Sequence, residues 1–288
     1  MKGIRVGFIG LGAIGRPMAA HLARAGCLVA VGNRSHAKAE AFAREFRVTA
    51  PADIAELSRA CNVIVLCVPA DADVTALADA IAANAAPGTI VIDHSTVSPA
   101  TSRAAHARLG ASGSNFLDAP VSGGVEGAIA GTLTIMAGGD EAALTTVRPV
   151  LDCYAARINH MGPVGAGEAT KAVNQVLVAG IAEAVCEGLA LGAASGLDPA
   201  KLLAAIGAGA AQCWFLDKRG ATMLRGEFGT GFKLSLLLKD LGIVRELART
   251  AGTDRTVIEQ ALADAAALTA GGHGDEDISA LIRLKRRG

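Results

Sequence analysis

The chain has few aromatic residues, no excess of charge of either sign and no cysteine motif. Only 3% of its 288 residues are aromatic although 51% are hydrophobic, so the core has to be built from Ala, Leu, Val and Ile. Lys plus Arg number 27 and Asp plus Glu number 27. This zero net charge argues against nucleic acid or an anionic membrane as a partner, because both favour a basic protein face.

The sequence also lacks signs of disulfides, metal ligands, membrane spans and signal peptides. Its six cysteines form no CxxC motif and stand at no metal-ligand spacing with histidine, so we expect small buried residues of a reducing cytoplasm and no metal. The longest stretch without a charge, Leu202 to Leu216, is shorter than the roughly 20 apolar residues of a membrane span. Glycines and Arg16 interrupt the apolar N-terminal region, which is unlike a signal peptide. A soluble cytoplasmic protein is expected.

A glycine-rich turn follows the first apolar segment. Residues 4–9 are typical of a buried parallel strand, and a helix is predicted to begin around Ile14 and to cover residues 17–25. In a dinucleotide site the first glycine makes the tight turn, the second admits the pyrophosphate, and the third lets the helix pack on the strand. The helix N-terminus attracts the phosphates. An ordinary glycine-rich turn is the alternative. The predicted cofactor-binding residues here are Gly10, Leu11, Gly12, Ala13, Ile14 and Gly15.

The next strand, Leu28 to Gly32, predicts which nicotinamide cofactor is preferred. Sites selective for NAD carry an acidic residue near this strand end, about 20 residues past the glycines, to bond the ribose 2′-hydroxyl. Here the position holds Asn33, followed by Arg34 and Ser35. An uncharged side chain leaves room for a 2′-phosphate, and Arg34 can pair with it, unless Arg34 is merely a solvated loop residue. The three residues therefore predict NADP binding, with NAD as the less favoured cofactor.

Strands and helices then alternate along the chain. This alternation predicts an α/β fold with a Rossmann-type, doubly wound, mostly parallel sheet, in which ligands bind beyond the carboxyl ends of the strands. Val68, Pro69 and Asp73 follow one predicted strand, and Thr96 follows the next. They are candidate cofactor contacts, although turn and helix-capping chemistry would place the same residues there. The predicted strands are 63–68, 89–93, 115–117, 133–137 and 158–161, and the helices 37–46, 71–86, 99–109 and 140–155.

The pattern changes after Met161. A glycine-rich linker, residues 162–167, leads into a long apolar helix, residues 167–194, which we expect to be buried against the sheet domain and a partner subunit. We predict an NADP-binding Rossmann domain over residues 1–163 and an all-helical substrate and oligomerisation domain over 164–288, joined by this helix. Further helices are predicted at 199–208, 216–224, 234–251, 256–270 and 275–285.

Three polar residues share one face of the long helix. Lys171, Asn174 and Gln175 stand at positions i, i+3 and i+4. A lysine on an apolar helix is costly to bury unless it has a partner or a function. Lys171 is therefore a candidate general acid/base, with Asn174 and Gln175 orienting the substrate or the lysine. The alternative is a lysine that extends its amine to solvent beside two capping amides.

Two other motifs carry binding hypotheses. Ser122, Gly123 and Gly124 form a turn whose consecutive backbone N–H groups suit a carboxylate, although such turns are common. Lys239 is a candidate cofactor contact from the helical domain, or else half of a surface ion pair with Asp240.

In their order and spacing, these motifs resemble those of the β-hydroxyacid dehydrogenase family, which includes 3-hydroxyisobutyrate dehydrogenase and semialdehyde reductases. The resemblance covers essentially the whole chain and implies a Rossmann domain, a helical domain, an active site in the cleft between them, and a homodimer or homotetramer. It also implies that Lys171 is the catalytic lysine, that Ser122–Gly124 bind a carboxylate, and that Thr96, Lys239 and the Val68, Pro69 and Asp73 segment contact the cofactor. The matching motifs are GFIGLGxxGxPM from Gly7, DAPVSGG from Asp118, GxGxxxKxxN from Gly165 and KDL from Lys239.

One residue departs from the family pattern. Gln175 stands where the family usually has a second asparagine, and its longer side chain should shift or shrink the substrate pocket. The predicted function is an NADP-preferring oxidoreductase that interconverts a small β-hydroxyacid and its semialdehyde or keto acid. The alternatives are an NADPH-dependent imine or promiscuous carbonyl reductase, suggested by Gln175 and the apolar residues 214–216, and a non-catalytic NADP-binding scaffold protein.

Overall fold

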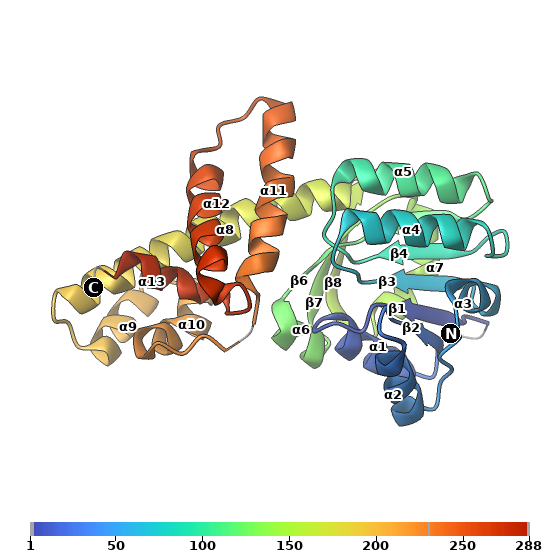
Figure 1. Cartoon of the computed structure of the whole chain (residues 1–288), viewed down its shortest axis with the longest axis horizontal. Helices are drawn as coiled ribbons and strands as arrows, with labels where there is room; N and C mark the ends of the chain where they lie inside the picture. The colour runs from blue at the N-terminus through green and yellow to red at the C-terminus, as the bar shows by residue number, and fades with distance from the viewer. Residues whose placement is uncertain (1–2, 230, 287–288) are drawn as a thin grey trace. The chain divides into compact units, whose positions relative to one another are not determined.

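The computed structural model describes residues 3–229 and 231–286 of the chain. It divides into two compact units, Met1–Lys171 and Ala172–Gly288, called here the first and the second unit (Figure 1). The first unit contains the sheet and the second unit is helical. Helix α8 (Ala166–Ala194) begins in the first unit and runs on through the start of the second.

The sheet of the first unit has the strand order β2-β1-β3-β4-β5-β7-β6, with β8 beside β7. Neighbours from β1 to β5 pair in parallel, whereas β7 is antiparallel to β5 and β6 and parallel to β8. The mostly parallel sheet predicted from the sequence is confirmed. The strands are β1 (Val6–Ile9), β2 (Leu28–Gly32), β3 (Val63–Leu66), β4 (Ile90–Asp93), β5 (Asn115–Asp118), β6 (Val121–Ser122), β7 (Leu133–Gly138) and β8 (Ala155–Gly162).

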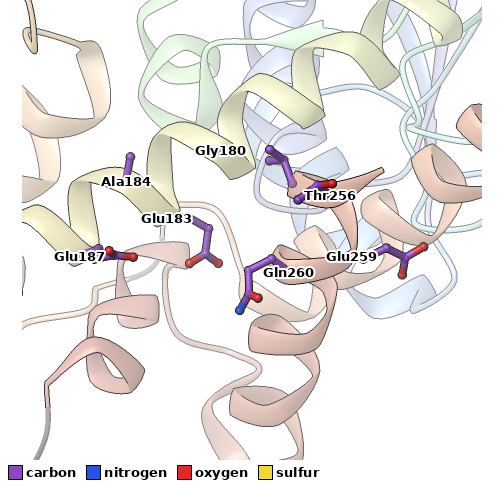
Figure 2. Close-up of a pocket in the computed structure, with 8 residues that line it drawn as sticks. Gly180, Glu183, Ala184, Glu187, Thr256, Glu259 and Gln260 are labelled. Atoms are coloured by element: carbon purple, nitrogen blue, oxygen red, sulfur yellow. The ribbon is translucent and has the colours of Figure 1, made fainter. Parts of the chain in front are cut away.

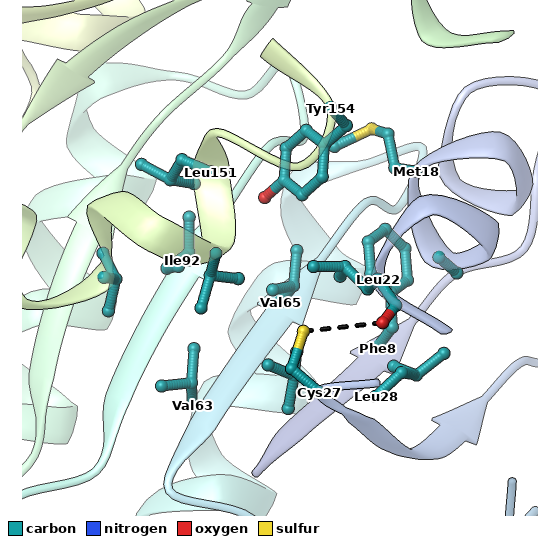
Figure 3. Close-up of a cluster of buried hydrophobic side chains, with 14 of the residues drawn as sticks. Phe8, Met18, Leu22, Cys27, Leu28, Val63, Val65, Ile92, Leu151 and Tyr154 are labelled. Carbon is teal, nitrogen blue, oxygen red and sulfur yellow. Dashed lines mark hydrogen bonds between the residues drawn. The ribbon is translucent and has the colours of Figure 1, made fainter. Parts of the chain in front are cut away.

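Helices cover both faces of this sheet because its central strands are apolar on both sides. Val63 and Val65 of β3 pack into one core and Ile64 and Leu66 into the other. Figure 3 shows the first core, in which Tyr154 is fully buried. Helices α1 (Gly15–Arg24), α2 (His36–Phe46), α6 (Gly124–Ala130) and α7 (Glu141–Leu151) contribute to that core, and α3 (Ile54–Ala60), α4 (Asp71–Ala82) and α5 (Pro99–Gly110) to the other.

The second unit packs its helices around a core that includes Cys186 of α8, Met223 of α10 and Leu241 of α11. No strand is described in it, as the sequence predicted, apart from an isolated bridge between Lys233 and Asp277. Its remaining helices are α9 (Pro199–Gly207), α10 (Trp214–Arg225), α11 (Leu234–Ala251), α12 (Thr256–Leu268) and α13 (Ile282–Lys285), with a π turn at Thr269–His273 and a 3-10 turn at Ile278–Leu281.

Helix α8 is long and apolar enough to cross a membrane by length and composition alone. However, Ala179, Ala182 and Cys186 on one face are buried in the helical core, which is the behaviour of a core helix. The opposite face stays exposed in the single chain, with Leu177 and Leu191 more than 60% exposed. The expected burial of α8 is confirmed for the side that faces the helical core, and its burial against a partner subunit stays a prediction.

The structure differs from the predicted elements in three segments. The helix expected at residues 275–285 is only a 3-10 turn and the short α13. Asp277 explains this difference, because its carboxylate accepts the backbone N–H groups of Gly231, Phe232 and Ser279 while its own backbone is extended, which breaks a continuous helix at this residue. Helix α3 and the β6–α6 segment were not predicted. For α3 the sequence carried a signal, since Asp53 and Glu56 have the spacing of a capping box: the Asp53 carboxylate accepts the Glu56 N–H, and the Glu56 carboxylate accepts the N–H of Ala52, one residue before the N-cap.

Candidate active site

The glycine turn after β1 is built so that two of its glycines cannot be replaced. Gly10 has φ 106°, and a Cβ there would lie 2.1 Å from the Cys67 carbonyl oxygen. A Cβ on Gly15 would lie 1.9 Å from the Gly10 carbonyl oxygen. Gly12 is exposed and a Cβ there would meet nothing within 4 Å. The turn therefore leaves open space at Gly12, beside the N-terminus of α1, where a pyrophosphate would fit.

Asn33 ties this turn to the end of β2. Its side-chain oxygen accepts a hydrogen bond from the Leu11 N–H at 3.0 Å, and its amide donates to the Ser35 carbonyl at 3.1 Å. Arg34 and Ser35 are exposed beside it. Asn33 thus fixes the backbone of the turn, and the contacts of Asn33, Arg34 and Ser35 with a cofactor stay predictions.

The ends of β3 and β4 are joined to each other at the same edge of the sheet. The Ser95 hydroxyl accepts the Val68 N–H at 2.9 Å, so the two loops are held in register. Val68, Asp73 and Thr96 are partly exposed and Pro69 is exposed. These four residues follow parallel strands whose carboxyl ends border the glycine turn, as a dinucleotide site requires, and their cofactor roles stay predictions.

Lys171 lies next to the turn that was predicted to bind a carboxylate. Its Nζ donates a hydrogen bond to the Val121 carbonyl at 3.0 Å, and the residue is only 9% exposed. Gly123 and Gly124, two and three residues after Val121, have φ of 129° and 66°, values that favour glycine. The structure therefore brings Lys171 and the Ser122–Gly124 turn together, although they stand some 50 residues apart in the sequence.

Asp118 positions the helix that carries Lys171. Its two carboxylate oxygens accept the N–H groups of Gly165 at 2.8 Å and Glu168 at 2.9 Å, at the start of α8. Glycine is needed where α8 meets the sheet, because a Cβ on Gly167 would lie 2.4 Å from the Met136 carbonyl oxygen. Asp118 belongs to the DAPVSGG motif, but the sequence alone predicts no role for it.

A second missed residue, His94, links three strands beneath the same turn. Its Nδ1 lies 2.5 Å from the Ala119 carbonyl, so Nδ1 carries a hydrogen and donates it. Its Nε2 then accepts the Tyr154 hydroxyl at 2.8 Å. Burial lowers the pKa of His94 to about 4, against the opposing effect of the Ala119 carbonyl. His94 is therefore neutral at physiological pH and holds the backbone that leads to Val121.

In the second unit, the predicted residues of α8 and α11 form one network. Asn174 donates to the Gln175 side-chain oxygen at 2.8 Å, and Gln175 donates to Asp240 at 2.6 Å. Lys239 lies 3.0 Å from the other oxygen of Asp240. Gln175 is buried, so it acts here as the link between Asn174 and Asp240, and a direct contact of Gln175 with substrate stays a prediction.

A pocket of about 660 Å³ lies elsewhere in the second unit, between α8 and α12 (Figure 2). It includes none of the predicted site residues, and Glu183, Glu187 and Glu259 line it. Their carboxylates would repel both a carboxylate substrate and the phosphates of a dinucleotide, so we do not assign either ligand to this pocket. Within residues 3–229 and 231–286, no three His, Cys, Asp or Glu side chains gather as metal ligands.

Family models match nearly the entire chain in two parts. Residues 5–162 match the NAD-binding domain of 6-phosphogluconate dehydrogenase. Residues 165–285 match the "NAD-binding of NADP-dependent 3-hydroxyisobutyrate dehydrogenase" family.

Similar proteins cover the same length. The chain is 34% identical to an NAD-dependent L-serine dehydrogenase of Pseudomonas aeruginosa, over 97% of each chain. It is 35% identical to a probable 3-hydroxyisobutyrate dehydrogenase of Mycobacterium bovis, over 98% of this chain and 97% of the other. The structure of Mycobacterium tuberculosis 3-hydroxyisobutyrate dehydrogenase with L-serine superimposes with a TM-score of 0.90, at 32% identity and over 99% of both chains.

Proposed function

The chain belongs to the β-hydroxyacid dehydrogenase family of NAD(P)-dependent oxidoreductases, and we propose that it interconverts a small β-hydroxyacid and its semialdehyde or keto acid, with NADP(H) preferred. The observation that carries this proposal is the hydrogen bond from Lys171 to the Val121 carbonyl, directly before the Ser122–Gly124 turn. A general acid/base and a carboxylate-binding turn are thereby adjacent within the first unit. A substrate with a carboxylate and a nearby carbonyl or hydroxyl group suits this arrangement.

Each group of the site has a chemical role in this proposal. The bound nicotinamide supplies or takes the hydride. The Ser122 hydroxyl and the N–H groups of Gly123 and Gly124 hold the substrate carboxylate, and Lys171 gives its proton to the carbonyl oxygen as the alcohol forms. Asp118 and the Val121 carbonyl keep the lysine in place through α8 and through its own hydrogen bond. Asn174 fixes the substrate geometry from the next turn of the helix.

Removal of the lysine amine tests the acid/base role. Lys171→Ala should lower turnover of glyoxylate, succinic semialdehyde or tartronate semialdehyde by about two to four powers of ten, the usual contribution of a general acid/base. Cofactor affinity, measured by fluorescence titration, should be retained. The control is Lys201→Ala, which removes an exposed lysine of α9. Near-normal turnover in Lys171→Ala would contradict the proposal.

NADP preference is proposed from Arg34, which is exposed beside the carboxyl end of β2. Its guanidinium would pair with the 2′-phosphate that distinguishes NADP from NAD. Arg34→Ala should reduce the ratio of kcat/KM for NADPH to kcat/KM for NADH, while the exposed Arg44→Ala of α2 should leave it unchanged. A wild-type enzyme that favours NADH, or a ratio insensitive to Arg34, would contradict this assignment.

We further propose a soluble, cytoplasmic homodimer or homotetramer without nucleic acid, membrane or metal partners. The zero net charge and the exposed apolar face of α8 support this part of the proposal.

A further inference from the structure

A chain of hydrogen bonds in the second unit connects Asn174 of α8 to an ion pair of α11. Asn174 Nδ2 donates to the Gln175 side-chain oxygen at 2.8 Å. Gln175 Nε2 donates to one oxygen of Asp240 at 2.6 Å, across 65 residues of sequence. The Lys239 ammonium lies 3.0 Å from the other oxygen of Asp240. All four residues belong to the second unit, so this network lies within it.

Gln175 is buried, whereas Asn174 is partly exposed. Only 1% of Gln175 and 4% of Asp240 is accessible to solvent. Asn174, one position before Gln175 on the same helix, keeps part of its surface accessible. The long side chain of Gln175 ends at Asp240. Gln175 is therefore placed to influence a ligand through Asn174.

Asp240 determines which end of the Gln175 amide faces it. A carboxylate only accepts hydrogen bonds, whereas an amide donates from its nitrogen and accepts at its oxygen. Gln175 therefore turns its nitrogen to Asp240, which leaves its oxygen for Asn174. The reverse orientation would place two acceptor oxygens against each other in a buried position, without a donor between them. The carboxylate at position 240 thus fixes the Gln175 amide.

The Gln175 oxygen in turn determines which end of Asn174 is held. It accepts a hydrogen bond from Asn174 Nδ2, so the nitrogen of Asn174 is engaged by its neighbour. A flipped Asn174 would bring its own oxygen against the Gln175 oxygen, and neither atom can donate. The side-chain oxygen of Asn174 therefore points away from Gln175 and is the acceptor that Asn174 offers to a ligand.

A β-hydroxyacid carries three groups on its second carbon: the carboxylate, the carbon that is oxidised or reduced, and one substituent. In the reaction proposed above, Ser122–Gly124 hold the carboxylate and Lys171 meets the reacting oxygen. Asn174 follows Lys171 by three positions on α8 and so shares its helix face. The substituent is the group that remains for Asn174. An acceptor oxygen in this place suits a substituent that donates a hydrogen bond.

We propose that Gln175 is a positioning residue that directs the Asn174 oxygen to the substituent, so that the enzyme prefers β-hydroxyacids whose second carbon carries a hydroxyl or an ammonium group. The proposal rests on the function proposed above. A methyl group of the same size leaves the Asn174 oxygen without a donor, which costs affinity. Because Asp240 and Gln175 hold the amide, Asn174 cannot turn this oxygen away. Gln175 acts through Asn174 alone.

Three substrates of nearly equal size test the preference. Serine, glycerate and 3-hydroxyisobutyrate carry an ammonium, a hydroxyl and a methyl group, respectively, on the second carbon. The faster enantiomer of each is compared in the direction of oxidation, with saturating NADP⁺. The wild-type kcat/KM for serine and for glycerate should exceed that for 3-hydroxyisobutyrate about tenfold or more. A value for 3-hydroxyisobutyrate that equals or exceeds both others would refute the proposed preference.

Gln175→Met tests the positioning role, because methionine fills a similar space but holds neither Asn174 nor Asp240. The Asn174 amide then has to be ordered when substrate binds, so kcat/KM for serine and glycerate should fall about three- to tenfold. The value for 3-hydroxyisobutyrate should change little, because its methyl group makes no use of the amide. Gln260→Met, at an exposed position of α12, is the matched control. A folded Gln175→Met enzyme with equal losses for all three substrates, or with none, would overturn the proposal.

A second readout does not depend on activity or on the folding of Gln175→Met. In cofactor-free ¹⁵N-labelled protein, NMR should show slower D₂O exchange for the side-chain amide of Asn174 than for that of Asn115, which is exposed on β5. Asp240→Asn should speed this exchange, because an amide at position 240 accepts either end of Gln175. Equal exchange of Asn174 and Asn115 in wild type would contradict the positioning role. If wild type oxidises none of the three hydroxyacids, the proposed function fails, and the exchange still reports whether Gln175 holds Asn174.

Discussion

Among single residues, His94 makes the stability of the first unit depend on pH. The unfolded chain takes up a proton on this histidine at about pH 6.5, the ordinary value, whereas the folded chain does so only near pH 4. Between these values the unfolded state binds more protons, so acidification favours unfolding. The neutral histidine therefore contributes its full share to the free energy of unfolding above pH 6.5, and this contribution is lost as the pH falls towards 4. The effect amounts to about 3 kcal/mol at most.

The corresponding prediction concerns the difference between wild type and His94→Gln. The free energy of unfolding of wild type should exceed that of the variant most above pH 6.5, and the excess should shrink steadily towards pH 4. Urea unfolding at several pH values measures both. Comparing variants isolates His94 from Asp93, whose pKa is raised by burial and gives the opposite pH dependence. His106→Gln, at an exposed position of α5, controls for the loss of a histidine. An excess that grows on acidification would show that His94 is not held neutral.

Residue types alone predicted some members of the candidate site but not the buried residues that position them. Lys171 was noticed because a lysine is unusual on an apolar helix, a local property of the sequence. Asp118 and Glu168 have no such local signal. Asp118 meets Gly165 and Glu168 only across 47 and 50 residues of chain, and the buried state of Glu168 follows from β4 and β5 lying beside α8. Contacts between segments far apart in the sequence determine their environment, and such contacts leave no periodic pattern in the sequence.

At the scale of elements, two glycines of the turn between β1 and α1 have different roles, Gly15 in folding and Gly12 in cofactor binding. A Cβ on Gly15 would collide with the backbone of Gly10, whereas a Cβ on Gly12 would enter open space. Gly15→Ala should therefore destabilise the protein by several kcal/mol or prevent folding, as overpacking against rigid backbone does. Gly12→Ala should fold with a nearly unchanged melting temperature.

The two variants should also differ in cofactor binding. Gly12→Ala should bind NADPH at least tenfold more weakly, because its methyl group occupies the space where the pyrophosphate approaches the backbone. Thermal unfolding and fluorescence titration of NADPH measure the two effects separately. Wild-type NADPH affinity in a folded Gly12→Ala protein would contradict the position assigned to the pyrophosphate.

Elements with strong local patterns were predicted close to their observed bounds. The apolar run Leu28–Gly32 and the amphipathic helix Leu234–Ala251 agree with β2 and α11 at both ends. The helix predicted at residues 275–285 was wrong, because the Asp277 carboxylate binds backbone N–H groups of the loop before α11. This contact outweighs helix propensity. The direction of β7 could not be predicted, since an apolar strand has the same pattern whichever way it runs.

For the molecule as a whole, the exposed apolar face of α8 is the proposed site of self-association. Val173, Leu177, Ile181 and Leu191 are exposed along one side of this helix. Leu177→Lys should lower the molecular mass measured by size-exclusion chromatography with light scattering, because a charge would be placed in a dry interface. Leu197→Lys, at an exposed leucine beyond the end of α8, is the control. A monomeric wild type would refute the proposed oligomer, and an unchanged mass for Leu177→Lys would exclude this face.

The course of α8 constrains how this enzyme could recombine with its relatives. A hybrid joined after residue 163 would inherit Lys171 from one parent but Asp118 and Val121, which hold that lysine and its helix, from the other. Parents that differ at these contacts would yield hybrids with a complete cofactor turn but a misplaced acid/base. The workable crossover point lies within α8, after its second turn, rather than in the glycine-rich linker.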